Sequence, residues 1–84
     1  MFSLRTGVLM TETEYGMALL DEGSGDYWTL NPTAAAVVRA MLDGRTVAQA
    51  ADALARDYDV DREAAEQDAT LILGQLREAG LAGT

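Results

Sequence analysis

The sequence predicts an α+β fold, a three-stranded antiparallel sheet followed by three helices, in the order of a winged helix-turn-helix whose wing comes first. Residues 7–30 contain the turns, glycines and β-forming residues of short strands. Residues 31–81 are rich in Ala, Leu and acidic residues at helical spacing. The two halves meet without a loop at residues 26–33, where an aromatic strand runs into a capped helix start. We expect the functional surface beside this junction.

Two short strands precede the aromatic one. Residues 8–10 form the first, and the polar residues 11–14 are expected to form a turn. Residues 15–20 are an apolar run of strand length, although Leu19 and Leu20 could instead belong to a short helix. Residues 21–26 then form a hairpin loop whose two glycines can take positive φ.

The third strand covers residues 27–30. Its alternation places Trp28 and Leu30 on one face and Tyr27 and Thr29 on the other. The sequence leaves open which aromatic side chain is buried and which meets a ligand. If the strands form a meander, this strand is a sheet edge with free N–H and C=O groups. A partner can add a fourth strand to such an edge.

The first two helices have clear start signals. Asn31 is the expected N-cap of the first helix, Pro32 its first helical residue, and Gly44 its left-handed C-cap. The second helix opens with a capping box formed by Thr46 and Gln49. The inward residues are expected to be Ala34, Val37, Val38, Met41 and Leu42 in the first helix, and Val47, Ala50, Ala51, Leu54 and Tyr58 in the second.

The third helix is expected to run from about Arg62 to Ala79, with Asp61 as its cap. Gly80 ends it, and Leu81 can fold back over its last turn. The expected core stripe consists of Ala65, Ala69, Ile72, Leu76 and Ala79.

A second stripe of the third helix lies next to the core stripe around the helix axis and contains both apolar and polar residues. An apolar side chain between two hydrogen-bonding ones suits the wall of a groove. The simpler alternative is partial burial at the edge of the helix. The stripe consists of Ala64, Asp68, Leu71 and Gln75.

Composition excludes several classes of site. The 84 residues suffice for one domain, residues 1–84, with 49% hydrophobic residues and neither Cys nor His. Disulfides, thiolate metal sites and Cys or His catalysis are therefore excluded. The net charge of -8 disfavours nucleic acid and anionic membranes and favours a basic peptide or protein, unless the acidic residues serve only solubility.

No motif indicates catalysis, a metal or a cofactor. Asp57, Asp59 and Asp61 alternate, but the Gly and Glu of a calcium loop are missing, and helix-end chemistry explains them better. No nucleophile has a visible base partner, so we expect no enzyme activity. The apolar runs are far shorter than the ~20 residues needed to span a bilayer, and residues 1–5 lack a signal-peptide pattern, so we expect a soluble, cytoplasmic protein.

An ordered set of residues resembles the PqqD-like family, the peptide-recognition elements of pathways that modify ribosomally made peptides. The resemblance spans residue 7 to the C-terminus. The Tyr-Trp-x-Leu-Asn form at residues 27–31 is most similar to the discrete recognition proteins of lasso-peptide clusters. The set consists of residues 25–31, 33–34, 37–38, 42–44, 54, 58–60, 68, 73–76 and 80–81.

The resemblance implies a winged helix-turn-helix that binds the leader segment of a precursor peptide as an added strand, between the third strand and the third helix. It also implies a second partner, the transglutaminase-like cysteine protease that removes the leader in lasso systems. Leu20, Tyr27, Trp28 and Leu71 would form an apolar patch, and Glu22 and Asp26 would meet basic leader residues. The candidate peptide-binding residues are Leu20, Glu22, Asp26, Tyr27, Trp28, Thr29, Leu30, Ala64, Asp68, Leu71, Ile72 and Gln75.

Two alternative functions come from other classes. A helix-turn-helix transcriptional regulator would need basic residues along a recognition helix. The third helix offers Arg62 and Arg77 against a larger number of acidic residues, which disfavours this function. A small protein-interaction or antitoxin-like module is the other alternative.

Overall fold

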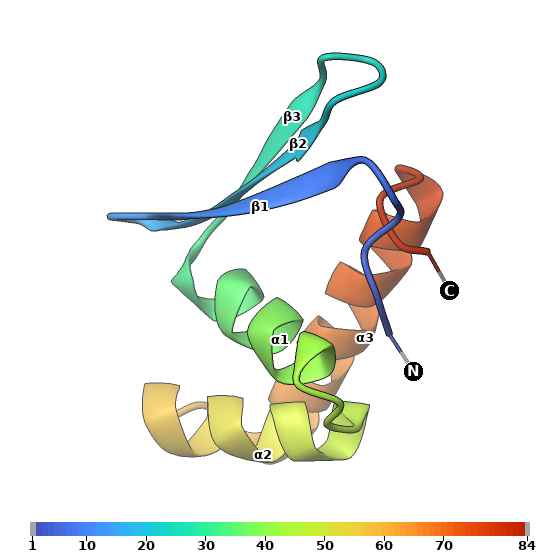
Figure 1. Ribbon diagram of the computed structural model, residues 1–84. Helices are drawn as coiled ribbons and strands as arrows, with labels where there is room; N and C mark the ends of the chain where they lie inside the picture. Colours follow the sequence, from blue (N-terminus) through green and yellow to red (C-terminus); the bar gives the residue numbers. More distant parts are fainter. Residues whose placement is uncertain (1, 84) are drawn as a thin grey trace.

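The computed structural model describes residues 2–83, so Met1 and Thr84, the ends of the predicted 1–84 domain, lie outside the described residues. An antiparallel sheet in the order β1-β2-β3 is followed by three helices (Figure 1). This confirms the α+β class and the β-β-β-α-α-α order, whereas the helix-turn-helix interpretation stays a prediction. The elements are β1 Val8–Thr13, β2 Gly16–Asp21, β3 Tyr27–Leu30, α1 Pro32–Leu42, α2 Val47–Tyr58 and α3 Arg62–Glu78.

The β1–β2 hairpin is longer than predicted. Thr13 pairs with Gly16, so the turn contains only Glu14 and Tyr15, and the predicted turn at residues 11–14 is wrong. Threonine suits a strand, and polar side chains are tolerated where a sheet faces solvent, so the polar run continues the strand instead of ending it. Tyr15 belongs to the turn and not to the strand.

The second strand also extends one residue further than predicted. Asp21 was expected in the hairpin loop, but it ends β2, pairs with Val8 across the sheet and is buried. Its carboxylate forms an ion pair with Arg5 and accepts a hydrogen bond from the Gly23 N–H at 2.9 Å. A buried carboxylate is stable in this strand because these partners compensate for its lost hydration.

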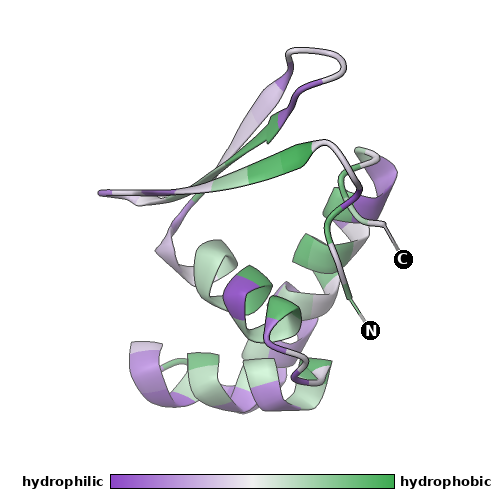
Figure 2. Ribbon diagram, viewed as in Figure 1, coloured by the Kyte–Doolittle hydropathy of each residue, from purple (hydrophilic) through white to green (hydrophobic). Residues whose placement is uncertain are grey.

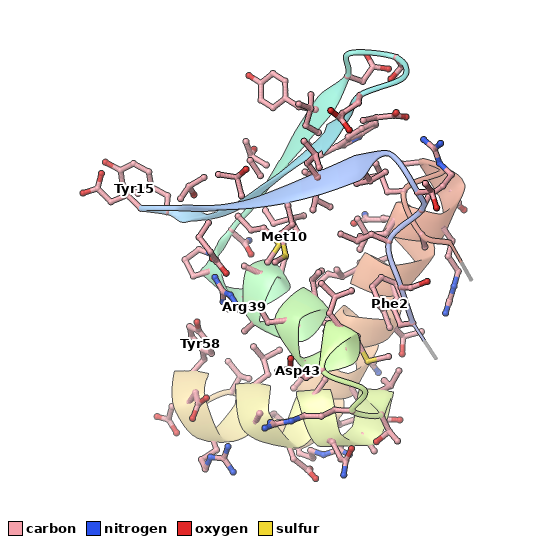
Figure 3. All side chains as sticks on the ribbon, viewed as in Figure 1. Phe2, Met10, Tyr15, Arg39, Asp43 and Tyr58 are labelled. Carbon is pink, nitrogen blue, oxygen red and sulfur yellow. The ribbon has the colours of Figure 1, made fainter. Side chains whose placement is uncertain are left out.

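The core lies between the inner face of the sheet and the helices. Met17 and Leu19 of β2 are fully buried, and Met10 of β1 also points toward the helices (Figure 3). Hydrophobic residues are found along α1 and α3 and at the start of β1 (Figure 2). The buried helical residues are Ala34, Ala35, Val37, Val38, Ala40, Met41, Ala50, Ala51, Leu54, Ala65, Ala69, Leu73 and Leu76.

Several side chains expected in the core are less buried. Leu42, Val47 and Ile72 are half-buried, and Ala79 is exposed. On α3 the buried row steps from Ala69 to Leu73 and then to Leu76, because residues four and three apart share a face.

Tyr58, expected in the core stripe of α2, is also exposed. It lies at the last residue of the helix, where its hydroxyl donates to the Pro32 carbonyl at 3.4 Å (Figure 3). A position at the end of a helix lets the phenol lie along the surface and keep its polar tip in solvent.

The helix ends largely follow the predicted chemistry. The Asn31 side chain accepts from the Ala34 N–H at 2.8 Å, and Thr46 and Gln49 form the capping box. Gly44 has the left-handed φ of 87° expected after α1. Asp61 occupies the N-cap position of α3 but makes no side-chain cap hydrogen bond, so its predicted cap is wrong in that respect. Leu81 is buried, and its N–H donates to the Leu76 carbonyl at 2.9 Å, which confirms the return over α3.

Candidate functional site

The strand β3 has a free edge, because within residues 2–83 it pairs with β2 alone. The Asp21 N–H donates to the Asp26 carbonyl at 2.9 Å, in the same register that pairs Leu20 with Tyr27. Antiparallel partners alternate between hydrogen-bonded and non-hydrogen-bonded pairs. It follows that the backbone groups of Trp28 and Leu30 face β2, while those of Tyr27 and Thr29 face outward.

This alternation sets the hydrogen-bonding capacity of the edge. Tyr27 and Thr29 each present one N–H and one C=O, which gives four groups. Between residues 2 and 83, no other backbone or side-chain group bonds to these four. An extended peptide that pairs with both residues would satisfy all four groups.

A groove separates β3 from α3. One hollow of ≈ 390 Å³ adjoins a second of ≈ 280 Å³, and the two share Thr29, Leu30, Ala34, Ile72 and Gln75. The edge of β3 therefore lies along a continuous groove. The remaining lining residues are Asn31, Thr33, Leu54, Asp68 and Leu71 in the first hollow, and Trp28, Leu76, Ala79 and Leu81 in the second.

The α3 wall of the groove contains three of the four residues of the predicted mixed stripe. Asp68, Leu71 and Gln75 all line it, and Leu71 is 60% exposed although it is a large apolar residue. Ile72 is half-buried, packs against the core and contributes the lower part of the wall. Ala64, one turn before Asp68, is exposed and does not line the groove.

The two adjacent aromatic residues of β3 have different environments. Trp28 is half-buried, packs against the core and lines the groove. Tyr27 is 69% exposed and lies on the outer face of the sheet, together with Leu20, its cross-strand partner. The predicted patch of Leu20, Tyr27, Trp28 and Leu71 is therefore divided between two faces.

The outer face carries an apolar row that runs across all three strands. Leu9 pairs with Leu20, and Leu20 pairs with Tyr27, so the three side chains are neighbours. Their exposed fractions are 48%, 39% and 69%. We call these three residues the outer row; its area stays uncovered in the described chain.

The sheet side of the molecule is acidic. The sequence contains no basic residue between Arg5 and Arg39. Arg39 forms a salt bridge with Glu12, and its hydrogen bond holds the pKa of that carboxyl below its usual value (Figure 3). Burial acts to raise the pKa of Asp21, but the Gly23 N–H and Arg5 outweigh it, and the pKa is lowered.

Three carboxylates on this side have no ion-pair partner among residues 2–83. They are Glu14 in the β1–β2 turn and Glu22 and Asp26 at the β2–β3 loop. Glu22 and Asp26 lie at the Tyr27 end of β3, outside the groove lining. Their predicted contact with basic peptide residues stays a prediction, and their position would place it beyond the end of the strand.

The part of the groove at the start of α1 was not predicted from the sequence. Asn31, Thr33 and Ala34 line it because β3 enters α1 without a loop, which brings the first turn of the helix to the end of the strand. The missing loop was visible in the sequence and was the signal for these residues. Leu76, Ala79 and Leu81 close the other end, at the C-terminus of α3.

No group of three or more Asp or Glu side chains within residues 2–83 is arranged to hold a metal ion. None of the three helices in this range combines the length and the hydropathy of a membrane-crossing segment.

Comparison with known proteins gives one family and two similar structures. Residues 16–82 match the family described as Coenzyme PQQ synthesis protein D (PqqD). A solved structure of a lasso peptide synthetase B1 complexed with the leader peptide is 43% identical, with a TM-score of 0.92 over 99% of this chain and 98% of that one. TbiB1, in complex with the TbiA(beta) leader peptide, shares the fold at 23% identity and a TM-score of 0.82, over 98% of this chain and 96% of that one. The comparison with curated proteins gives no match.

Proposed function

Since the chain belongs to the PqqD family, we propose that it binds the leader segment of a ribosomally made precursor peptide as a fourth strand. The peptide pairs with the free edge of β3 and lies in the groove beside α3. The observation that carries the proposal is the position of this unpaired edge along an open groove. A structure 43% identical to the chain, of a protein complexed with a leader peptide, supports it.

Backbone pairing alone is too weak to hold such a peptide. Four strand hydrogen bonds contribute ~0.5–1.5 kcal/mol each, and the ordering of a flexible peptide consumes much of that. Micromolar affinity requires ~8 kcal/mol. Apolar contacts at ~1.5–3 kcal/mol per buried side chain must supply the remainder. The exposed Leu71 and the half-buried Trp28 are the groove residues best placed to do so.

The alternation of the bound strand separates the candidate residues into two groups. Peptide side chains that point into the groove meet Trp28, Leu71 and Ile72, between the polar groups of Asp68 and Gln75. Side chains that point the other way lie next to Tyr27 and continue the outer row. Leu20 acts only through that row, because it is one strand away from the edge.

We further propose that the chain delivers the bound leader to a second partner. The chain, as a single non-catalytic cytoplasmic domain, carries the bound leader to the transglutaminase-like cysteine protease of a lasso-peptide pathway. Simultaneous binding of both partners raises their effective concentration. The outer row supports this role, because a peptide on the β3 edge leaves Leu9 and Leu20 uncovered for a second partner.

Two alanine substitutions in α3 test peptide binding. Leu71→Ala and Asp68→Ala should each weaken the affinity for the leader by about tenfold, because they remove an apolar contact and a polar partner from the groove wall. Both residues are exposed, so the thermal midpoint should change little. The affinity is measured by fluorescence anisotropy with a labelled synthetic leader peptide of the precursor.

The matched control is Thr70→Ala, an exposed change on the same helix outside the groove. It should leave the affinity unchanged. If the wild-type chain does not bind the leader at tens of micromolar, the proposed function is wrong.

Delivery is tested on the outer row. Leu9→Ser should weaken the complex with the protease, and slow removal of the leader severalfold, because it places a hydroxyl in an apolar contact. Leader affinity should stay within about twofold, since Leu9 is two strands away from the β3 edge. Calorimetric titration of the protease with each variant measures the affinity of the complex between the chain and the protease. An unchanged protease affinity would exclude the outer row as its docking surface.

A further inference from the structure

A further hollow adjoins the groove at the end of β3, where the β1–β2 turn approaches the start of α1. Its volume is ≈ 730 Å³, and its surface is mostly apolar. Thr29, Leu30 and Asn31 line both this hollow and the groove beside Asp68, so the two lie next to each other at the end of β3. The remaining lining residues are Thr13, Tyr15 and Pro32.

Tyr15 is the largest side chain of this hollow, and the backbone of its turn is positioned by the neighbouring Gly16. Gly16 has a φ of 145°, and a Cβ at this position would lie 2.1 Å from the Leu30 carbonyl oxygen. Because Gly16 has no side chain, the turn packs directly on the backbone at the end of β3. Tyr15 therefore stands at the tip of the hairpin (Figure 3), 78% exposed, beside the exit of the groove.

The course of an added strand determines what reaches this hollow. All strand pairs of the sheet are antiparallel, and a fourth strand that continues this pattern runs opposite to β3. Its N-terminal end then leaves the edge at Leu30. Beyond Leu30 the chain turns into α1 (Figure 1), and the hollow beside the β1–β2 turn lies at this end of β3. At a rise of about 3.3 Å per residue, the one to three residues before the paired segment extend about 3–10 Å beyond Leu30, at the end of β3 where this hollow lies.

The chemistry of the hollow selects an apolar occupant. The Asn31 side-chain oxygen already accepts from the Ala34 N–H and from the Thr33 hydroxyl, at 2.8 and 2.9 Å. The rings of Tyr15 and Pro32 and the side chain of Leu30 are the apolar groups among the lining residues. Resting on the function proposed above, we propose that this hollow is a subsite for a large apolar side chain of the peptide, located just N-terminal to its paired segment. Tyr15 is a specificity-determining residue that acts outside the β3–α3 groove.

A coupling experiment tests the subsite. The affinities of the wild-type chain and of Tyr15→Ala are measured by anisotropy against the full synthetic leader and a series of its N-terminal truncations. Tyr15→Ala should weaken binding of the full leader by about tenfold, as expected for the loss of one aromatic contact. The two proteins should bind equally once the truncation removes the residue that occupies the hollow, while the paired segment still binds the wild type.

Glu14→Gln is the matched control in the same turn, because Glu14 does not line the hollow; it should not show the coupling. Tyr15→Phe should keep the wild-type affinity, since the ring and not the hydroxyl makes the contact. Equal effects of Tyr15→Ala on full and truncated peptides, no effect on either, or coupling to the C-terminal flank would each overturn the inference. A leader that binds the wild type normally but is insensitive to Tyr15 contradicts only the subsite. No binding to the wild type contradicts the proposed function and the subsite with it.

Discussion

Thr29→Pro should reduce leader affinity on the order of 100-fold. The Thr29 N–H faces the free edge of β3 and is one of the four groups available to an added strand. Proline removes this donor and places its ring in the path of the peptide. The loss leaves a peptide carbonyl unpaired, which costs ~1–3 kcal/mol beyond the steric conflict.

The sheet itself should tolerate this change, because proline is accepted in edge strands where the N–H points away from the sheet. Thr29→Val is the matched control: it keeps the N–H, the branched shape and the strand preference, and it should bind the leader like the wild type. The comparison is made by anisotropy, with the thermal midpoint of each variant as a check of folding. A Thr29→Pro variant that folds and still binds within threefold of the wild type would show that the peptide does not pair with β3.

Gly16→Ala should destabilise the fold by about 3 kcal/mol or more. At a φ of 145°, a residue with a side chain is strained by ~1–3 kcal/mol. The added methyl carbon would also lie 2.1 Å from the Leu30 carbonyl oxygen and 3.0 Å from the Asn31 carbonyl carbon, both of them backbone atoms. The end of β3 would have to move away from β2, and equilibrium unfolding in urea measures the loss.

Gly74→Ala should change the free energy of unfolding in the opposite direction and serves as the comparison. Gly74 lies inside α3, and a Cβ there would have no atom within 4 Å apart from the neighbouring backbone of the helix itself. Alanine should therefore stabilise the helix by ~0.5–1 kcal/mol. If Gly16→Ala is tolerated as well as Gly74→Ala, the close contact between the turn and β3 is wrong.

The sequence predicted the elements wherever a local signal was strong. Asn31-Pro32 and the Thr46–Gln49 box fixed the helix starts within one residue. The signals failed where pairing overrode composition. Residues 11–13 have the polar composition of a turn, but they pair with residues 16–18 of β2 and therefore belong to the sheet. Which of Ile72 and Leu73 is buried depends on how α3 rotates against α1 and α2, and spacing alone does not define that rotation.

The candidate site was predicted in part. Helical periodicity predicts that Asp68, Leu71 and Gln75 share one face of α3, and strand periodicity predicts that the side chains of β3 alternate between the two faces of the sheet. All three α3 residues line the groove, together with residues of β3. Periodicity could not decide between Tyr27 and Trp28, because it shows that they face opposite ways but not which face meets the helices. The outer row could not be predicted from the sequence either, because it depends on the register of three strands whose residues lie far apart in the chain.

The most direct test of the central claim is amide hydrogen exchange of β3, followed by NMR with and without the leader. In the free chain, the Trp28 and Leu30 amides should already be protected by β2, whereas those of Tyr27 and Thr29 should exchange rapidly. A saturating leader should slow exchange at Tyr27 and Thr29 by at least about tenfold, because both amides then donate to the added strand. A leader that binds and leaves these two amides exchanging as before would contradict the added-strand mode of binding.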